Sequence, residues 1–203
     1  MIVVIEGHNA TAYSTLLTEM FRLRARIFRE RRGWDVQVNE QGEERDKYDD
    51  PQLGPTYIIV TDEEARTVKG SVRLLPTTGP TVHDEIFSGA AHDATRLSAP
   101  TIWECNRLCF DESLELGNWK ELFSVARTLL AAVGDVSLKA GIECLTGDFD
   151  NVMLRVYRRL GFEVEILATT TKYGAPVHAA LVPISSQIIE RSKQKLTEMQ
   201  AAM

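Results

Sequence analysis

The chain has 203 residues, a length that suits one α/β domain with a full hydrophobic core. Its formal net charge of −6 argues against a general nucleic-acid binder. No apolar stretch approaches the roughly 20 residues that cross a bilayer, and the first residues lack the basic segment of a secretory signal. We therefore expect a cytoplasmic protein that binds neither membranes nor nucleic acids.

Three cysteines, at positions 105, 109 and 144, form an odd set without paired spacing. Buried free thiols pack as small apolar groups, so we expect packing here rather than disulfides. The four histidines are scattered and form no ligand spacing with these cysteines. The sequence therefore predicts no metal site.

Residues 2–6 favour a first strand, and two apolar lines at helical spacing favour a helix over 12–32. One of these lines contains Arg24, which either reaches water or pairs with a buried carboxylate, for which Asp46 and Asp49 are candidates. Gly33 is expected to end the helix in left-handed backbone.

The segment 34–55 is a long charged loop, and loops of this length inside a domain are often functional. After the loop, the sequence predicts a hairpin at 57–61 and 68–75 and a strand at 102–110. A helix at 117–140, a buried strand at 142–146 and a helix near 150–160 ending at Gly161 follow. Closing strands at 162–167 and 177–184 and a polar helix at 185–201 complete the prediction. This order predicts a single domain, 1–203, with a mixed sheet covered by helices.

Several charged residues stand where a fold does not need them. Asp46 and Asp49 lie in the loop, Arg73 in a hairpin strand, and Glu104 and Arg107 in an otherwise apolar strand. A charge inside a strand costs stability unless it is paired. These residues either satisfy one another in a network that only fixes the loop, or they build a site. The sequence contains no phosphate-binding glycine loop, nucleophile elbow or HExxH motif.

Four motifs occur in order between residues 24 and 107. They are Arg24-x3-Phe28-x5-Trp34, Asp46-x2-Asp49, Arg73-Leu-Leu-Pro-Thr-Thr-Gly-Pro and Trp103-Glu104-x2-Arg107. Together they resemble the acyl-homoserine lactone synthases of quorum-sensing bacteria. The resemblance implies a GNAT-like three-layer αβα sandwich with a mixed, mostly antiparallel, splayed central sheet. The segment 156–167 is similar to the helix-turn-strand that closes many GNAT sheets, whereas the glycine-rich loop that holds coenzyme A in ordinary GNAT enzymes is missing.

The resemblance also implies a reaction. An acyl group passes from acyl carrier protein or acyl-CoA to the amine of S-adenosylmethionine, and the product then lactonises and releases methylthioadenosine. Glu104 is the expected general base, and Arg107 is expected to stabilise the charged cluster or to meet the ligand carboxylate. The residues implied in S-adenosylmethionine binding are Arg24, Phe28, Trp34, Asp46, Asp49 and Arg73. No cofactor is expected, because S-adenosylmethionine is a substrate.

The chain departs from the family on the acyl side. Thr81-Val82-His83 stands where many relatives carry a methionine–leucine pair, and Asn106 where a serine is common. The candidate acyl-pocket residues are Trp103, Val82 and Thr146, and the acyl chain itself is not predicted. The candidate docking residues for an acidic carrier protein are Arg26, Arg29, Arg155 and Arg159, although an acyl-CoA donor would use similar charge.

In a regular strand Glu104 and Arg107 would point to opposite faces, because they are three residues apart. We therefore predict a β-bulge between them, a feature common beside active sites. Two other interpretations stay open. A GNAT-type acetyltransferase would act on another amine without S-adenosylmethionine. A non-catalytic module that binds S-adenosylmethionine or an acyl ligand would tolerate Glu104→Gln.

Overall fold

The computed structural model describes residues 1–64, 66–87, 97–115, 119–172 and 174–202. The chain forms two compact units. Unit 1 comprises Met1–Leu74 and Arg107–Ala132, and unit 2 comprises Leu75–Asn106 and Val133–Met203. The expected single domain stays a prediction, and each unit is described by itself.

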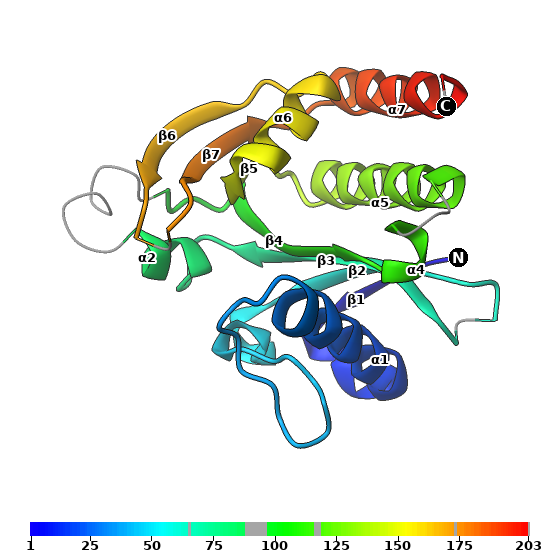
Figure 1. Cartoon of the computed structure of the whole chain (residues 1–203). Coiled ribbons are helices and arrows are strands. Elements are labelled where there is room, and N and C mark those ends of the chain that lie inside the picture. Colours follow the sequence, from blue (N-terminus) through cyan, green and yellow to red (C-terminus); the bar gives the residue numbers. More distant parts are fainter. Residues whose placement is uncertain (65, 88–96, 116–118, 173, 203) are drawn as a thin grey trace. The chain divides into compact units, whose positions relative to one another are not determined.

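Unit 1 is built on the antiparallel strands β1 (Ile2–Glu6), β2 (Thr56–Thr61) and β3 (Val68–Pro76). The helix α1 (Ser14–Arg24) follows β1 after a 3-10 segment, Gly7–Tyr13, and packs on this sheet (Figure 1). Both apolar lines of the helix are used. The shared core contains Ile5, Leu17, Met20, Phe21, Leu23, Ile27, Phe28, Tyr57, Ile59, Val68 and Cys109.

The helix predicted over 12–32 is confirmed for most of its length, with one difference in winding. After Arg24 the chain continues as a π-helical segment, Ala25–Arg31. Gly33 then adopts φ +66°, which confirms the expected left-handed end. Short π-helical stretches occur often at functional sites, because the wider turn redirects side chains.

The long loop after α1 is ordered by local turns. Val38 and Glu44 form an isolated β-bridge, and two short 3-10 helices follow, Lys47–Asp49 and Pro51–Leu53. Asp46 caps the first of them by accepting the N–H of Tyr48, while the Asp49 carboxylate accepts the N–H of Asp46. Hydrogen bonds from nearby backbone N–H groups thus fix the side chains of both predicted loop acids.

Unit 2 contains the strands β5 (Cys144–Asp150), β6 (Glu165–Thr170) and β7 (Val177–Pro183), together with the first half of β4 (Ile102–Phe110). β4 pairs with β5 in parallel, and β7 pairs with β5 and β6 antiparallel. The helices are α2 (Val82–Ile86), α6 (Asn151–Arg159), α7 (Ser186–Ala201) and the end of α5 (Trp119–Lys139). Gly134 of α5 lies against Ile189 of α7, where a Cβ would come within 2.8 Å. The short helix α4 (Glu112–Glu115) follows β4.

The strand order is β1-β2-β3-β4-β5-β7-β6, with β4 contributing to both units. Four of the described strand pairs are antiparallel and one is parallel, which confirms the predicted α/β class with a mixed, mostly antiparallel sheet. The splay of the central strands stays a prediction. Some bounds differ: β5 starts at Cys144 and runs on to Asp150, and β6 covers Glu165–Thr170 where 162–167 was predicted. The short helices α2 and α4 were not predicted. No helix within the described ranges combines the length and hydropathy of a membrane span.

Candidate active site

Six charged side chains in unit 1 form what we call the ionic cluster. They are Arg24, Glu44, Asp46, Asp49, Arg73 and Arg107. They come from α1, the long loop, β3 and β4. Three guanidinium groups face three carboxylates, so the formal charges balance, as buried charges require.

Arg24 is the last residue of α1 and is completely buried. Its guanidinium donates to Glu44 and, through two nitrogens, to both oxygens of Asp49 at 2.9 and 3.0 Å. Asp46 is more distant, at 3.9 Å. Burial alone would lower the pKa of Arg24, but Asp49 and Glu44 raise it above its ordinary value. Arg24 is therefore the buried, paired cation that the helix pattern predicted.

Asp49 is the most heavily bonded carboxylate of the ionic cluster. It accepts from Arg24, from Arg73 at 2.7 Å and from the Tyr57 hydroxyl at 2.9 Å. Burial would raise the pKa of Asp49, but the two guanidinium groups outweigh burial and hold it well below its usual range. Arg73 also binds Asp46 with both terminal nitrogens, at 2.6 and 3.0 Å. The predicted pairing of the loop acids with Arg24 and Arg73 is thus present.

Arg107 marks the irregular position of β4. Its φ is +55°, a left-handed conformation that residues other than glycine rarely adopt, and such strain gathers at functional sites. Its side chain donates to Glu44 at 3.2 Å and to Asp46 at 2.8 Å. The described irregularity of β4 thus lies at Arg107 itself, and the β-bulge that we predicted between Glu104 and Arg107 stays a prediction.

Glu44 is the member of the ionic cluster that sequence reasoning missed. It is 1% exposed and contacts both Arg24 and Arg107. Its N–H donates to the carbonyl of Phe21, which fixes the loop against α1. A count of charges would not have indicated it, because the predicted acids Asp46, Asp49 and Glu104 already balanced the three arginines.

The predicted aromatic pair lies beside the ionic cluster. The rings of Phe28 and Trp34 stack with centroids 5.1 Å apart and planes 7° from parallel. Phe28 is buried, and the Arg107 guanidinium is 5.6 Å from its ring. Trp34 is 45% exposed, and its backbone N–H donates to the backbone carbonyl of Phe28. The partly exposed Trp34 ring is thus supported by the buried Phe28 ring.

Glu104 belongs to unit 2, and its carboxylate is 1% exposed. It accepts the backbone N–H groups of Val82 at 3.1 Å and His83 at 2.8 Å, and the side-chain amide of Asn106 at 2.8 Å. We expected Arg107 beside it, but the described carboxylate partners of Arg107 are Glu44 and Asp46. Glu104 is thus held mainly by amide donors, which favour a charged carboxylate.

The candidate acyl-pocket residues also lie in unit 2. Thr146 is buried opposite Glu104 in the β4–β5 register, and its hydroxyl donates to the carbonyl of Ala180. Trp103 is half-buried and donates through its indole to Pro100, and Val82 begins α2. The structure places these residues near Glu104 in the sheet and helix but does not test their role.

Cys105 follows Glu104 directly. Burial, followed by the Glu104 charge, raises the pKa of the Cys105 thiol to about 12. A thiol that stays protonated is a poor nucleophile. We therefore expect no acyl-cysteine intermediate, which agrees with the packing role predicted for the free cysteines.

The candidate docking arginines are exposed. Arg26 and Arg29 have side chains 38% and 52% exposed, with Asp111 and Asp35 as their salt-bridge partners at 3.8 and 3.2 Å. Arg155 and Arg159 lie on α6 of unit 2 and are also exposed. Such exposed pairs contribute little to stability, so these guanidinium groups remain available to an acidic partner.

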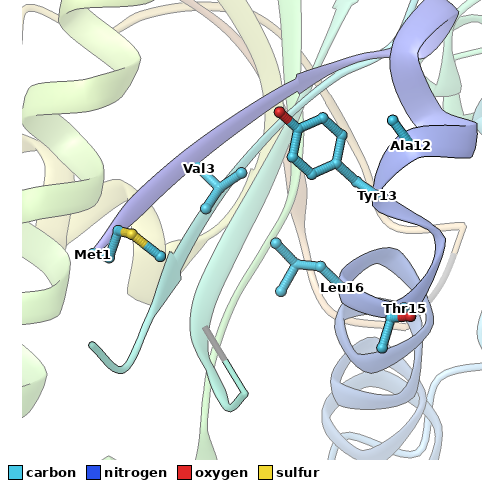
Figure 2. Close-up of a pocket in the computed structure, with 6 residues that line it drawn as sticks. All are labelled: Met1, Val3, Ala12, Tyr13, Thr15 and Leu16. Carbon is cyan, nitrogen blue, oxygen red and sulfur yellow. The ribbon is translucent and has the colours of Figure 1, made fainter. Parts of the chain in front are cut away.

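A shallow pocket of about 310 Å³ lies elsewhere in unit 1 (Figure 2). Its lining comprises Met1, Val3, Ala12, Tyr13, Thr15 and Leu16, none of which is a predicted site residue. Figure 2 shows Val3, Tyr13 and Leu16 facing its hollow from β1 and the helical segment. Within the described part of the chain, no group of three or more His, Cys, Asp or Glu side chains is placed to hold a metal ion.

Comparison with solved structures first defines the class of fold. The chain superimposes on FeeM, an N-acyl amino acid synthase from uncultured soil microbes, with a TM-score of 0.57 at 15% identity, covering 90% of this chain and 92% of that one. That likeness shows a common fold alone. A CoA-dependent acyl-homoserine lactone synthase, BjaI, solved with SAM and isopentyl-CoA, has a TM-score of 0.83 at 29% identity, covering 97% of this chain and 89% of that one.

Sequence comparison then gives the family. The model for the autoinducer synthases matches residues 8–192. An acyl-homoserine-lactone synthase from Rhizobium etli is 42% identical over 150 residues, which is 74% of this chain and 68% of that protein. Another, from Agrobacterium fabrum, is 31% identical over 88% of this chain and 83% of that protein. The chain belongs to the autoinducer synthase family.

Proposed function

We propose that this chain acylates the amine of S-adenosylmethionine and closes the product to an acyl-homoserine lactone, a quorum-sensing signal. As a member of its family it is an acyl-homoserine-lactone synthase, an acyltransferase. The proposed mechanism rests on the buried carboxylate of Glu104, which belongs to the Trp103-Glu104-x2-Arg107 motif. Three N–H donors fix this carboxylate.

The first step needs a base. The α-ammonium of S-adenosylmethionine must lose a proton before its nitrogen can attack an acyl thioester. Glu104 takes that proton, directly or through water. The new N–C bond forms as the C–S bond of the thioester breaks, and the thiol carrier leaves with a proton.

The second step depends on the conformation of the bound substrate more than on a catalytic group. A carboxylate oxygen of the methionyl part attacks its own γ-carbon, and the carbon–sulfur bond of the sulfonium breaks. Methylthioadenosine leaves with the electron pair, so no electrons are gained or lost overall. The protein must hold the substrate folded so that these atoms meet.

The ionic cluster and the aromatic pair suit the remaining parts of S-adenosylmethionine. A guanidinium binds a carboxylate with two parallel hydrogen bonds, and Arg107 is the least buried arginine of the ionic cluster, with 15% of its side chain exposed. Phe28 and Trp34 offer π-faces to the adenine or to the sulfonium cation. We infer that the other members of the cluster chiefly hold the long loop in place.

Replacing Trp34 with alanine is expected to weaken substrate binding while leaving the chemical step nearly intact. A cation or base stacked on an aromatic ring gains about 1–2 kcal/mol, so KM for S-adenosylmethionine should rise about tenfold with kcat within about threefold. Trp34→Phe is the matched control and should recover most of the affinity. Steady-state kinetics with saturating acyl donor measures both, and an unchanged KM in Trp34→Ala would remove Trp34 from the binding site.

The thioester donor is proposed to be acylated carrier protein, a partner with a strongly acidic surface. Reversing the charge of Arg26 and Arg29 together should raise its KM about tenfold and more so at low salt, because steering between exposed charges is screened by ions. Arg66→Glu is the control, since Arg66 is an even more exposed arginine, with 80% of its side chain exposed, on the β2–β3 turn. An unchanged KM would discard docking at these arginines, and turnover with acyl-CoA alone would identify that donor instead.

Mass spectrometry of the product tests the function as a whole. The purified chain is incubated with S-adenosylmethionine and with acyl carrier protein or CoA thioesters of several lengths. We expect an acyl-homoserine lactone and methylthioadenosine in equal amounts. Acetyl transfer to another amine without S-adenosylmethionine would support the general acetyltransferase. Ligand binding without any acyl product would support the non-catalytic module.

A further inference from the structure

A histidine of unit 2 joins two buried carboxylates, and the reaction described above gives it no role. His83 is the second residue of α2, and its N–H donates to Glu104 at 2.8 Å. Its ring Nδ1 lies 3.0 Å from an oxygen of Asp148. The two side chains are 4% and 7% exposed. We refer to them as the His83–Asp148 pair.

The strand register explains why the two carboxylates are neighbours. Glu104 of β4 lies opposite Thr146 of β5, and residues directly opposite one another share a face of the sheet. Asp148 is two residues beyond Thr146, so it points to the same face. The helix α2 lies on this face, where its second residue reaches Glu104 through its backbone and Asp148 through its ring.

His83 also anchors α2. The hydrogen bond to Asp148 links the helix to β5, and the imidazole stacks on Phe87 at 5.0 Å. The helix N–H groups that hold Glu104 come from Val82 and His83. Any shift of α2 would therefore move the donors that orient the Glu104 carboxylate.

The surroundings of the His83 ring are acidic. Among the described residues, Asp84 of α2, Glu104 of β4 and Asp148 of β5 are charged groups that act on it. Burial would lower the pKa of His83, but these three carboxylates, Asp148 foremost, outweigh burial and raise it. Asp148 has one oxygen committed to His83, and its other oxygen has no hydrogen-bond partner among the described residues.

We propose that His83, anchored by Asp148, is a positioning residue that fixes α2 against Glu104 and places a positive charge beside this base. The inference rests on the proposed function, in which Glu104 takes the proton of the substrate amine. A neighbouring cation favours the ionised form of a carboxylate. Glu104 then stays ready to accept a proton in mildly acidic solution, where an isolated buried carboxylate would already be protonated.

The test is the pH profile of lactone formation in His83→Gln and Asp148→Asn. Both retain the backbone N–H groups that bind Glu104. The first removes the imidazolium, and the second removes the carboxylate that favours it. The acid limb of kcat/KM should move to higher pH by about one unit in each variant. Near pH 6 the rate should thus fall about tenfold, whereas at high pH, once the histidine of the parent has lost its proton, it should fall less than about twofold.

Two further measurements separate positioning from general stability. The KM for S-adenosylmethionine should stay within about twofold of that of the parent. The double variant should lose no more activity than either single variant, because the two residues act as one unit. His178→Gln is the matched control, since His178 is a half-buried histidine of the same unit, bonded to Thr169 and Asn151. It should leave the profile unchanged.

The possible outcomes are distinct. A parent protein that makes no lactone would overturn the proposed function and this inference with it. A parent that makes lactone, with variants that lose activity equally at every pH and melt at lower temperature, would leave the function standing and overturn the role of His83 as a positive charge beside Glu104. Variants with an unaltered profile would overturn it as well.

Discussion

Replacing Arg24 with methionine should lower the free energy of unfolding by about 3–5 kcal/mol at pH 7, because removing one partner of a buried ion pair leaves the others uncompensated. Arg24 is completely buried, and its loss would leave the carboxylates of Glu44 and Asp49 next to α1 without this cation. Methionine preserves helix propensity and much of the side-chain volume. The loss is therefore electrostatic, and urea unfolding monitored by circular dichroism measures it.

The pH dependence of this loss follows from Asp49. Its pKa is depressed in the folded protein, so its ionic bonds stabilise the fold above the pKa of the unfolded chain, near 4, and are lost as the pH falls toward the folded value. In Arg24→Met the Asp49 carboxylate loses one of the two cations that depress its pKa and protonates more readily. The stability difference between parent and variant should consequently be largest at neutral pH and shrink below about pH 4.

Arg22→Met is the matched control for this experiment. Arg22 lies on the same helix but is exposed, and its partners among the described residues are Glu19 at 2.9 Å and, more weakly, a loop carbonyl. Its replacement should change stability by less than about 0.5 kcal/mol. Equal losses in both variants, or a loss in Arg24→Met that does not vary with pH, would contradict a central role of the ionic cluster in holding the loop.

The ionic cluster also shows what periodicity in a sequence can reveal. Arg24 was identifiable because it interrupts an apolar line at helical spacing, and a buried guanidinium requires a carboxylate. Glu44 was not identifiable in that way, since it lies in a loop whose residues follow no period. Its position depends on the bridge to Val38 and on the hydrogen bond to Phe21, which form only in the folded chain. Charge balance gave no signal either, because Glu104 had been taken as the third acid of the predicted network.

The surroundings of Glu104 show the same limit. The spacing of Glu104 and Arg107 led us to predict a β-bulge between them, because alternation in a strand is a local property. The left-handed backbone at Arg107 is a different kind of irregularity. The helix α2 is only five residues long, too short to leave an apolar period. Thr81 and Asp84 do form a local capping box, but that motif says nothing of a carboxylate 21 residues further on. Contacts of this kind come from tertiary structure.

Replacing Glu104 with glutamine should lower kcat for acyl transfer by about 10²–10⁴, the usual contribution of a general base. The amide keeps the size of the side chain but cannot accept the proton of the substrate ammonium. S-adenosylmethionine should still bind within about threefold of the parent, because the proposed binding residues are untouched. Single-turnover acylation and isothermal titration calorimetry measure the two quantities separately.

Glu104→Asp separates the loss of the base from damage to the fold. Glutamine places an amide NH2 near the N–H groups of Val82 and His83, and two facing donors cost about 1–3 kcal/mol. Aspartate avoids that conflict and keeps the charge, although it retreats by one methylene. It should recover part of the rate, most clearly at high pH. Full activity in Glu104→Gln would show that another group, or solvent, removes the proton, because no step of acyl transfer can begin while the substrate nitrogen remains an ammonium ion.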